Sequence, residues 1–217
     1  MARAKSLLAA LVVALAAAAV ALADDPIVKI NAADQAKATA QLLKKSDVGR
    51  LWTGGPRKPD PLHAISCPGF SPKESDLVVT GHADATFSSQ NLGAQLDSDV
   101  QVMQRASFVR TDFARTMTPK LPGCLAHAFR QSAGQGMKLL SATRLPFPRV
   151  GAVSARYRLT TLFTSNGHAF KVLLDFVFVG QSRTEYALTL TGPELAFTVL
   201  AGFETRLAKL LVARTRA

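Results

Sequence analysis

Acidic residues are scarce in this 217-residue sequence, which has 15 of them against 26 lysines and arginines. With so few carboxylates, the chain has few candidates for the pair of acids that glycoside hydrolysis requires. Aromatic residues make up only 7% and are mostly phenylalanine, so no stacking platform for nucleic acid is indicated. The serine-hydrolase elbow, the zinc-protease helix motif, the phosphate-binding glycine loop and the calcium loop are all missing. The sequence therefore predicts no catalytic residues, no cofactor and no nucleic-acid partner.

Long apolar runs are also missing, except at the start of the chain. Arg3 and Lys5 precede an apolar run over residues 7–20, and Ala21 and Ala23 place small residues where a signal peptidase reads them. The alternative is a membrane anchor, but the run is short for the ~20 residues that spanning requires. We expect cleavage between Ala23 and Asp24, and an exported mature chain without a transmembrane segment.

The formal charge of +11 is spread along the chain. Outside the cytoplasm, a basic surface suits an anionic component of the cell envelope or an acidic partner. The same charge also serves simply to keep a protein soluble. The oligomeric state and the identity of any partner are not indicated by the sequence.

Only two cysteines occur, Cys67 and Cys124. An even number of cysteines in an exported chain predicts a disulfide between them. An alternative is a zinc site, because His63 and His127 stand four residues before Cys67 and three after Cys124. An oxidising compartment favours the disulfide, so no metal site is predicted.

The mature chain alternates between helical and strand patterns. We predict a helix over residues 31–45, a long loop rich in proline and glycine over residues 49–75, and two strands from residue 77 to residue 104. Stripes of apolar residues spaced by four then predict two short helices, which contain Val109 to Met117 and Leu121 to Phe129.

The last third of the chain is the most regular. Strands are predicted over residues 136–145, 155–163, 170–178 and 184–191, with Asn166-Gly167 as a hairpin turn. A long amphipathic helix follows Pro193. The fold class is therefore α+β: a mainly antiparallel sheet of about six strands, covered by N-terminal, middle and long C-terminal helices. Residues 24–217 are predicted to form a single domain.

Phenylalanines of this region could line a cleft between the sheet and a helix. The candidates for an apolar or small-molecule ligand are Phe163, Phe170, Phe176, Phe178 and Phe203. The alternative is that these side chains only fill the core. A second, weaker candidate is the pair of His82 and Asp84, which point the same way from one strand and could act as a base and its orienting group. We expect that pair to belong to a solvated strand face.

The stretch over residues 100–129, VQVMQRASFVRTDFARTMTPKLPGCLAHAF, resembles PknH-like extracellular sensor domains. Phe108 and Phe113 would match the aromatic helix of that family, and Pro122-Gly123-Cys124 its Pro-x-Cys. The wider layout is similar to Mog1/PsbP-like α/β/α sandwiches. Those sensor domains commonly hold two disulfides, whereas this chain can form one.

The resemblance implies an exported ligand-binding or sensor-like module without catalytic activity. The ligand it implies is not defined. The alternatives are an extracytoplasmic hydrolase, with His82 or another histidine within about 3 Å of a nucleophile or a carboxylate, and an interaction domain that uses its basic surface.

Overall fold

The computed structural model describes residues 24–134, 136–165 and 167–216. The predicted signal peptide, residues 1–23, and Asn166 of the predicted turn lie outside the described residues. No helix in the described part of the chain is long and apolar enough to cross a membrane.

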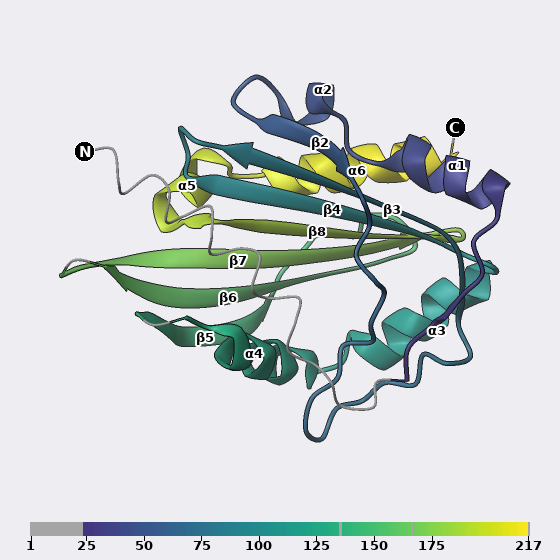
Figure 1. Cartoon of the computed structure of the whole chain (residues 1–217), viewed down its shortest axis with the longest axis horizontal. Coiled ribbons are helices and arrows are strands. Elements are labelled where there is room, and N and C mark those ends of the chain that lie inside the picture. The colour runs from purple at the N-terminus through teal and green to yellow at the C-terminus, as the bar shows by residue number, and fades with distance from the viewer. Residues whose placement is uncertain (1–23, 135, 166, 217) are drawn as a thin grey trace.

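The predicted α+β class with a mainly antiparallel sheet is confirmed (Figure 1). In chain order, the described strands are β1 (Ile27–Val28), β2 (Thr53–Arg57), β3 (Val78–Ser89), β4 (Ala94–Met103), β5 (Met137–Leu145), β6 (Val153–Ser165), β7 (His168–Gln181) and β8 (Thr184–Pro193). The described helices are α1 (Ala32–Gln41), α2 (Lys45–Val48), α3 (Ala106–Thr116), α4 (Leu121–Ser132), α5 (Glu194–Val199) and α6 (Phe203–Arg216).

The described strands form one sheet in the order β1-β3-β4-β8-β7-β6-β5. β1 runs parallel to β3, and the other pairings of the described strands are antiparallel. β2 also pairs with β3, beside its later half, whereas β1 lies beside its first residues. The centre of the sheet is thus built from β3, β4, β8 and β7.

Helices cover the two faces of the sheet unequally. On one face, which we call the α6 face, α1 and α6 pack on alternate residues of β3, β4, β8 and β7, such as Phe87, Leu96 and Val177. On the other face, which we call the α4 face, α4 packs on β5 and β6 through Leu125 and Phe129. α3 packs beside α4 on this face, through Phe113 against Phe178. α3 also contacts one end of β3 and β4, at Val79 and Met103. The segment after β2 crosses the polar part of these two strands, as the blue trace in Figure 1 shows.

The described residues form eight strands where about six were predicted, because the short β1 precedes the first predicted helix and the predicted loop over residues 49–75 contains β2. Glycine and proline suit this particular strand. A Cβ on Gly54 would lie 2.1 Å from the carbonyl oxygen of Thr86, so only glycine permits the close approach to β3. Pro56 is tolerated because proline's missing N–H matters least at the edge of a sheet.

The predicted long C-terminal helix is divided into α5 and α6. The division falls at Gly202, whose φ of 74° suits glycine and interrupts the helical backbone. Leu207 and Leu211 on α6 are fully buried, whereas Leu195 and Val199 on α5 are largely exposed. The apolar stripe seen in the sequence therefore packs on the sheet only along α6.

Candidate functional site

The five predicted cleft residues do not all lie on one face. Phe163 and Phe170 meet edge to face, with ring centroids 5.1 Å apart, and belong with Phe176 and Phe178 to the cluster under α4. Phe203 lies on the opposite α6 face and stacks on Trp52 at 5.5 Å. None of the five lines the polar hollow that opens between β3, β4 and β8. That the four on the α4 face bind an apolar ligand stays a prediction.

The predicted disulfide joins Cys67 to Cys124, with Cα atoms 5.5 Å apart. Because the two sulfur atoms bond each other, they are not available to a zinc ion. His63 instead places Nδ1 3.0 Å from a carboxylate oxygen of Asp25. The disulfide ties the segment after β2 to α4, on the face that this segment crosses.

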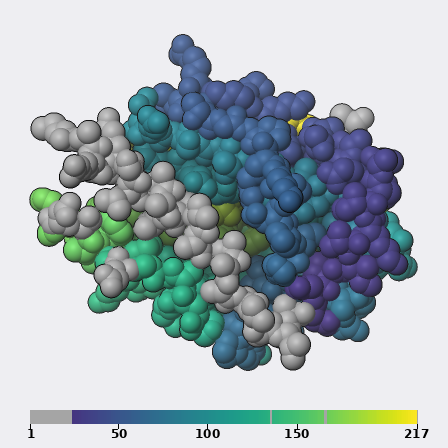
Figure 2. Space-filling model, viewed as in Figure 1, coloured from purple at the N-terminus to yellow at the C-terminus, as the bar shows by residue number. Residues whose placement is uncertain are grey.

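A polar hollow of about 210 Å³ opens on the α4 face, between β3, β4, β8 and the segment after β2. Its lining residues are Arg57, Asp60, Pro61, Leu62, His82, Asp84, Asp97, Ser98, Asp99, Ala187 and Thr189. Figure 2 shows olive atoms of β8 at the bottom of the hollow, beside the blue segment.

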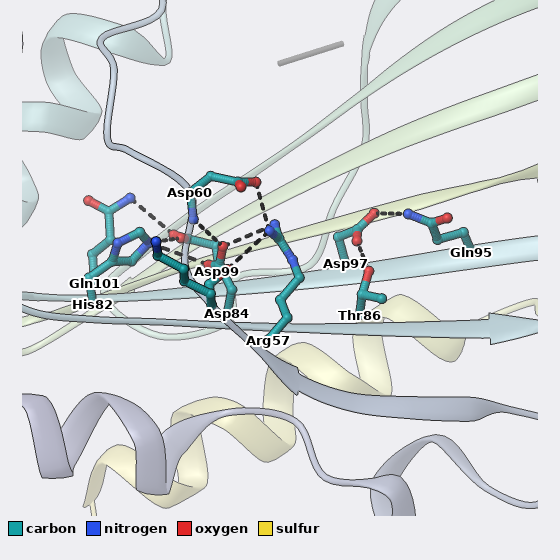
Figure 3. A network of polar contacts seen from close by, with 10 residues as sticks. Arg57, Asp60, His82, Asp84, Thr86, Gln95, Asp97, Asp99 and Gln101 are labelled. Carbon is teal, nitrogen blue, oxygen red and sulfur yellow. Dashed lines mark hydrogen bonds and ion pairs between the residues drawn. The ribbon is translucent and has the colours of Figure 1, made fainter. Parts of the chain in front are cut away.

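Strand alternation explains why this part of the sheet is polar. In β3, His82, Asp84 and Thr86 alternate with Ala83 and Ala85, which face the core on the other side. The antiparallel register then sets His82 opposite Gln101, Asp84 opposite Asp99 and Thr86 opposite Asp97. Side chains that are far apart in the sequence therefore meet in one polar row (Figure 3).

His82 lies between two carboxylates. Its Nε2 is 2.5 Å from Oδ2 of Asp99 and 3.4 Å from Oδ1 of Asp84. Gln101 donates from Nε2 to the second oxygen of Asp99, at 3.0 Å. The histidine and the two aspartates thus form a compact triad.

Asp84 is the most buried carboxylate of this triad, with 3% of the residue exposed. Its Oδ2 accepts a hydrogen bond from the backbone N–H of Asp60 at 3.1 Å and lies 3.0 Å from Nη2 of Arg57. Its Oδ1 has no hydrogen-bond partner although it is buried. A buried acceptor without a donor lowers the stability of the folded protein, so this oxygen indicates a place for a cation or a hydrogen-bonding ligand.

The surrounding charges shift the pKa values of the triad. Burial by itself lowers the pKa of His82, but the close approach and the negative charge of Asp84 and Asp99 outweigh it and raise the pKa to about 9. Burial by itself raises the pKa of Asp84, but the close approach and the positive charge of His82 contribute to a net lowering. At neutral pH the imidazole is therefore protonated and Asp84 is ionised.

The same face holds a second group of acids, near the start of β8. Burial raises the pKa of Glu185 well above its ordinary value, and the nearby charges of Asp112 and Glu74 raise it further. Burial raises the pKa of Glu74 to about 8. A chain with few acids thus gathers many of them on one face of its sheet.

No protein-family model matches the chain, and no curated protein matches it. A similar solved structure is that of PA94 from Pseudomonas aeruginosa, a protein of unknown function described as a putative regulator. The two share 15% identity with a TM-score of 0.30, over 53% of this chain and 70% of that chain. A likeness this weak says nothing about the site.

Sequence reasoning singled out His82 and Asp84, but the interpretation as a solvated strand face is wrong, because 7% and 3% of these residues are exposed. It missed Asp99, Arg57 at the end of β2 and Asp60 in the segment after β2. One signal was present: polar residues at alternate positions from Gln95 to Gln101 indicate that β4 has a polar face to set against that of β3.

Proposed function

We propose that the protein is an exported binding module that takes a small cationic solute into the polar hollow. The observation that carries the proposal is the charge of the lining. Four aspartates face the hollow, and the cationic groups among the lining residues are Arg57 and His82. The lining is therefore negative on a protein whose overall charge is strongly positive.

The volume of the hollow supports a small ligand. At about 210 Å³ it is below the ~300–1,000 Å³ of pockets that enclose drug-sized molecules. It has room for an ion with its waters, or for the amine or guanidine end of a longer molecule. This proposal departs from the apolar ligand expected from the phenylalanines, since the lining is polar.

An extracytoplasmic hydrolase is the second candidate, favoured by the 2.5 Å between His82 and Asp99. That distance meets the geometric requirement for a general base and its orienting carboxylate. The raised pKa of His82 disfavours the role of general base, because an imidazole that is already protonated at neutral pH cannot accept a proton. Binding is therefore the better supported function.

The test begins with the mature chain purified from its own host and examined by native mass spectrometry for a bound small molecule or ion. The ligand-free protein is then titrated with metal salts, putrescine, guanidinium and arginine, and followed by amide chemical shifts. We expect shifts in residues 82–86 and 97–101, weakened in the variant Asp97→Asn and retained in Glu194→Gln, which changes an exposed acid on α5. Absence of any shift at the hollow with every cation would overturn the proposal.

A further inference from the structure

We propose that the hollow holds a divalent transition-metal ion, bound by Nε2 of His82, Oδ1 of Asp84 and Oδ2 of Asp99. This inference rests on the proposed function and names its ligand. The three donor atoms all lie within 4.8 Å of one another. One imidazole nitrogen with two carboxylate oxygens is a donor set for Zn²⁺ or Mn²⁺.

The distances suit one ion between the three atoms. With bonds of ~2.0–2.2 Å, donors around a tetrahedral ion stand ~3.3–3.5 Å apart. Nε2 of His82 and Oδ1 of Asp84 are already 3.4 Å apart. The contact between His82 and Asp99 is shorter, at 2.5 Å, because a hydrogen bond joins them, and a small side-chain rotation opens it.

The buried oxygen of Asp84 is the independent observation that points to a cation. Oδ1 lacks a hydrogen-bond partner, and the side chain is only 4% exposed. Figure 3 shows the side chain of Asp84 beside those of His82 and Asp99, which supply the other two donor atoms. A metal ion would give this atom a partner at bonding distance, which it otherwise lacks.

Each carboxylate is held by its other oxygen. Gln101 donates to Oδ1 of Asp99 at 3.0 Å, and the backbone N–H of Asp60 donates to Oδ2 of Asp84 at 3.1 Å. Arg57 also lies 3.0 Å from Oδ2 of Asp84. One oxygen of each aspartate is therefore fixed by the protein, and the other is left toward His82. Such outer contacts orient the ligands of metal sites.

Three protein ligands leave one or more coordination positions for water, and these positions would face the hollow. Binding exchanges a proton for the metal: the Nε2–H bond of His82 breaks, the nitrogen donates its electron pair to the ion, and the proton leaves to solvent.

The test uses the mature, oxidised chain after treatment with a chelator. It is titrated calorimetrically with ZnCl₂, MnCl₂, MgCl₂ and CaCl₂, each alone, in two buffers of different ionisation enthalpy. We expect one metal per chain, affinity in the order Zn²⁺ above Mn²⁺ above Mg²⁺ and Ca²⁺, and release of a proton. Asp99→Asn and His82→Gln should weaken Zn²⁺ binding about 100-fold or more, and Gln101→Ala about 10-fold. Glu194→Gln should bind like the wild type.

The outcomes separate this inference from the proposed function. If no metal binds but an organic cation shifts the hollow in a manner sensitive to Asp97→Asn, the metal site is wrong and the binding function stands. If Zn²⁺ binds equally well to Asp99→Asn and His82→Gln, the ion sits elsewhere and the inference fails. If nothing binds, both proposals fail. Circular dichroism checks that each variant folds, and proton release by the wild type tests the site without any variant.

Discussion

Two clusters of buried carboxylates lie on opposite faces of the same sheet and differ in how their charge is met. On the α6 face, Asp175 is fully buried, and both of its oxygens accept hydrogen bonds from Arg156 and Arg158. Arg156 also lies 2.7 Å from Glu204 of α6. On the α4 face, Asp84 shares one histidine with Asp99 and keeps one oxygen without a donor.

The difference shows which cluster is structural. The arginines around Asp175 supply donors to both oxygens, as a buried carboxylate requires for stability. The triad on the other face has more negative than positive charge, and it opens into a hollow rather than into packed side chains. Oε1 of Glu204 also lacks a hydrogen-bond partner, but it lies among packed side chains of the α6 face. A carboxylate with both oxygens bonded, such as Asp175, fixes the fold, whereas an unpartnered one next to a hollow suits a ligand.

The largest expected effect comes from the disulfide, which restrains the α4 face and not the α6 face. It spans 57 residues, so its loss should lower the free energy of unfolding by about 4 kcal/mol on the chain-entropy model. Because it ties down the segment that carries Asp60, reduction should also alter the amide signals around the hollow more than those around Asp175. Denaturant unfolding and NMR with and without dithiothreitol measure both effects. Equal changes on the two faces would contradict this picture.

Removing the carboxylate of the saturated cluster should have the next largest effect. Asp175→Asn would leave two partly buried arginines without their shared anion and should lower the free energy of unfolding by about 3 kcal/mol. Urea unfolding of the variant against Glu194→Gln provides the measurement. A loss below about 1 kcal/mol would mean that Asp175 is not the centre of a structural cluster.

Much of the fold could be predicted because its signals are local. The hairpin of β6 and β7 and the strand β8 follow from alternating residues and short turns, and the disulfide follows from the even cysteine count. β2 could not be predicted, because Gly54 and Pro56 are strand breakers everywhere except at a close-packed sheet edge.

The candidate site could be predicted only in part, because it depends on register and on coverage. Alternation put His82 and Asp84 on one strand face, but nothing local says that Asp99 is the cross-strand neighbour of Asp84. Nor does it say that Asp60 and Leu62 cover this face and turn an apparently solvated pair into a buried one. The pairing of Cys67 with Cys124 ties the segment after β2 to α4, but it does not determine which strands this segment crosses.

The second acid group on the α4 face should make stability depend on pH. Glu74 has a pKa of about 8 in the folded protein against 4.5 ordinarily, and the pKa of Glu185 is also raised, so the folded state binds more protons than the unfolded state above about pH 4.5. Stability should therefore fall as pH rises from 4.5 toward 8. Glu185→Gln should flatten this fall and gain on the order of 1 kcal/mol at pH 8.

Urea unfolding at pH 5.0 and 6.5 separates the acids from His82, whose contribution is fully present below its ordinary pKa of 6.5 and is lost only toward pH 9. Burial also raises the pKa of Glu204, on the α6 face, to about 8, so Glu204 adds to the same fall and Glu185→Gln separates the two faces. The control is Glu194→Gln, which should follow the wild-type curve. A wild-type stability that rises between pH 5.0 and 6.5 would show that these acids are ionised without penalty in the folded protein.

The smallest expected change in the free energy of unfolding is that of Asp99→Asn, and it tests directly whether the triad is structural. Asp99→Asn keeps the shape of the side chain and removes one of two carboxylates that compete for His82, so in chelator its free energy of unfolding should stay within about 1 kcal/mol of the wild type. Addition of Zn²⁺ at 100 times its dissociation constant should then stabilise the wild type by about 2.7 kcal/mol and the variant far less. A loss near 3 kcal/mol in chelator, matching that of Asp175→Asn, would mean that the triad is a second structural ion cluster. In that case the hollow would be only the gap left above it.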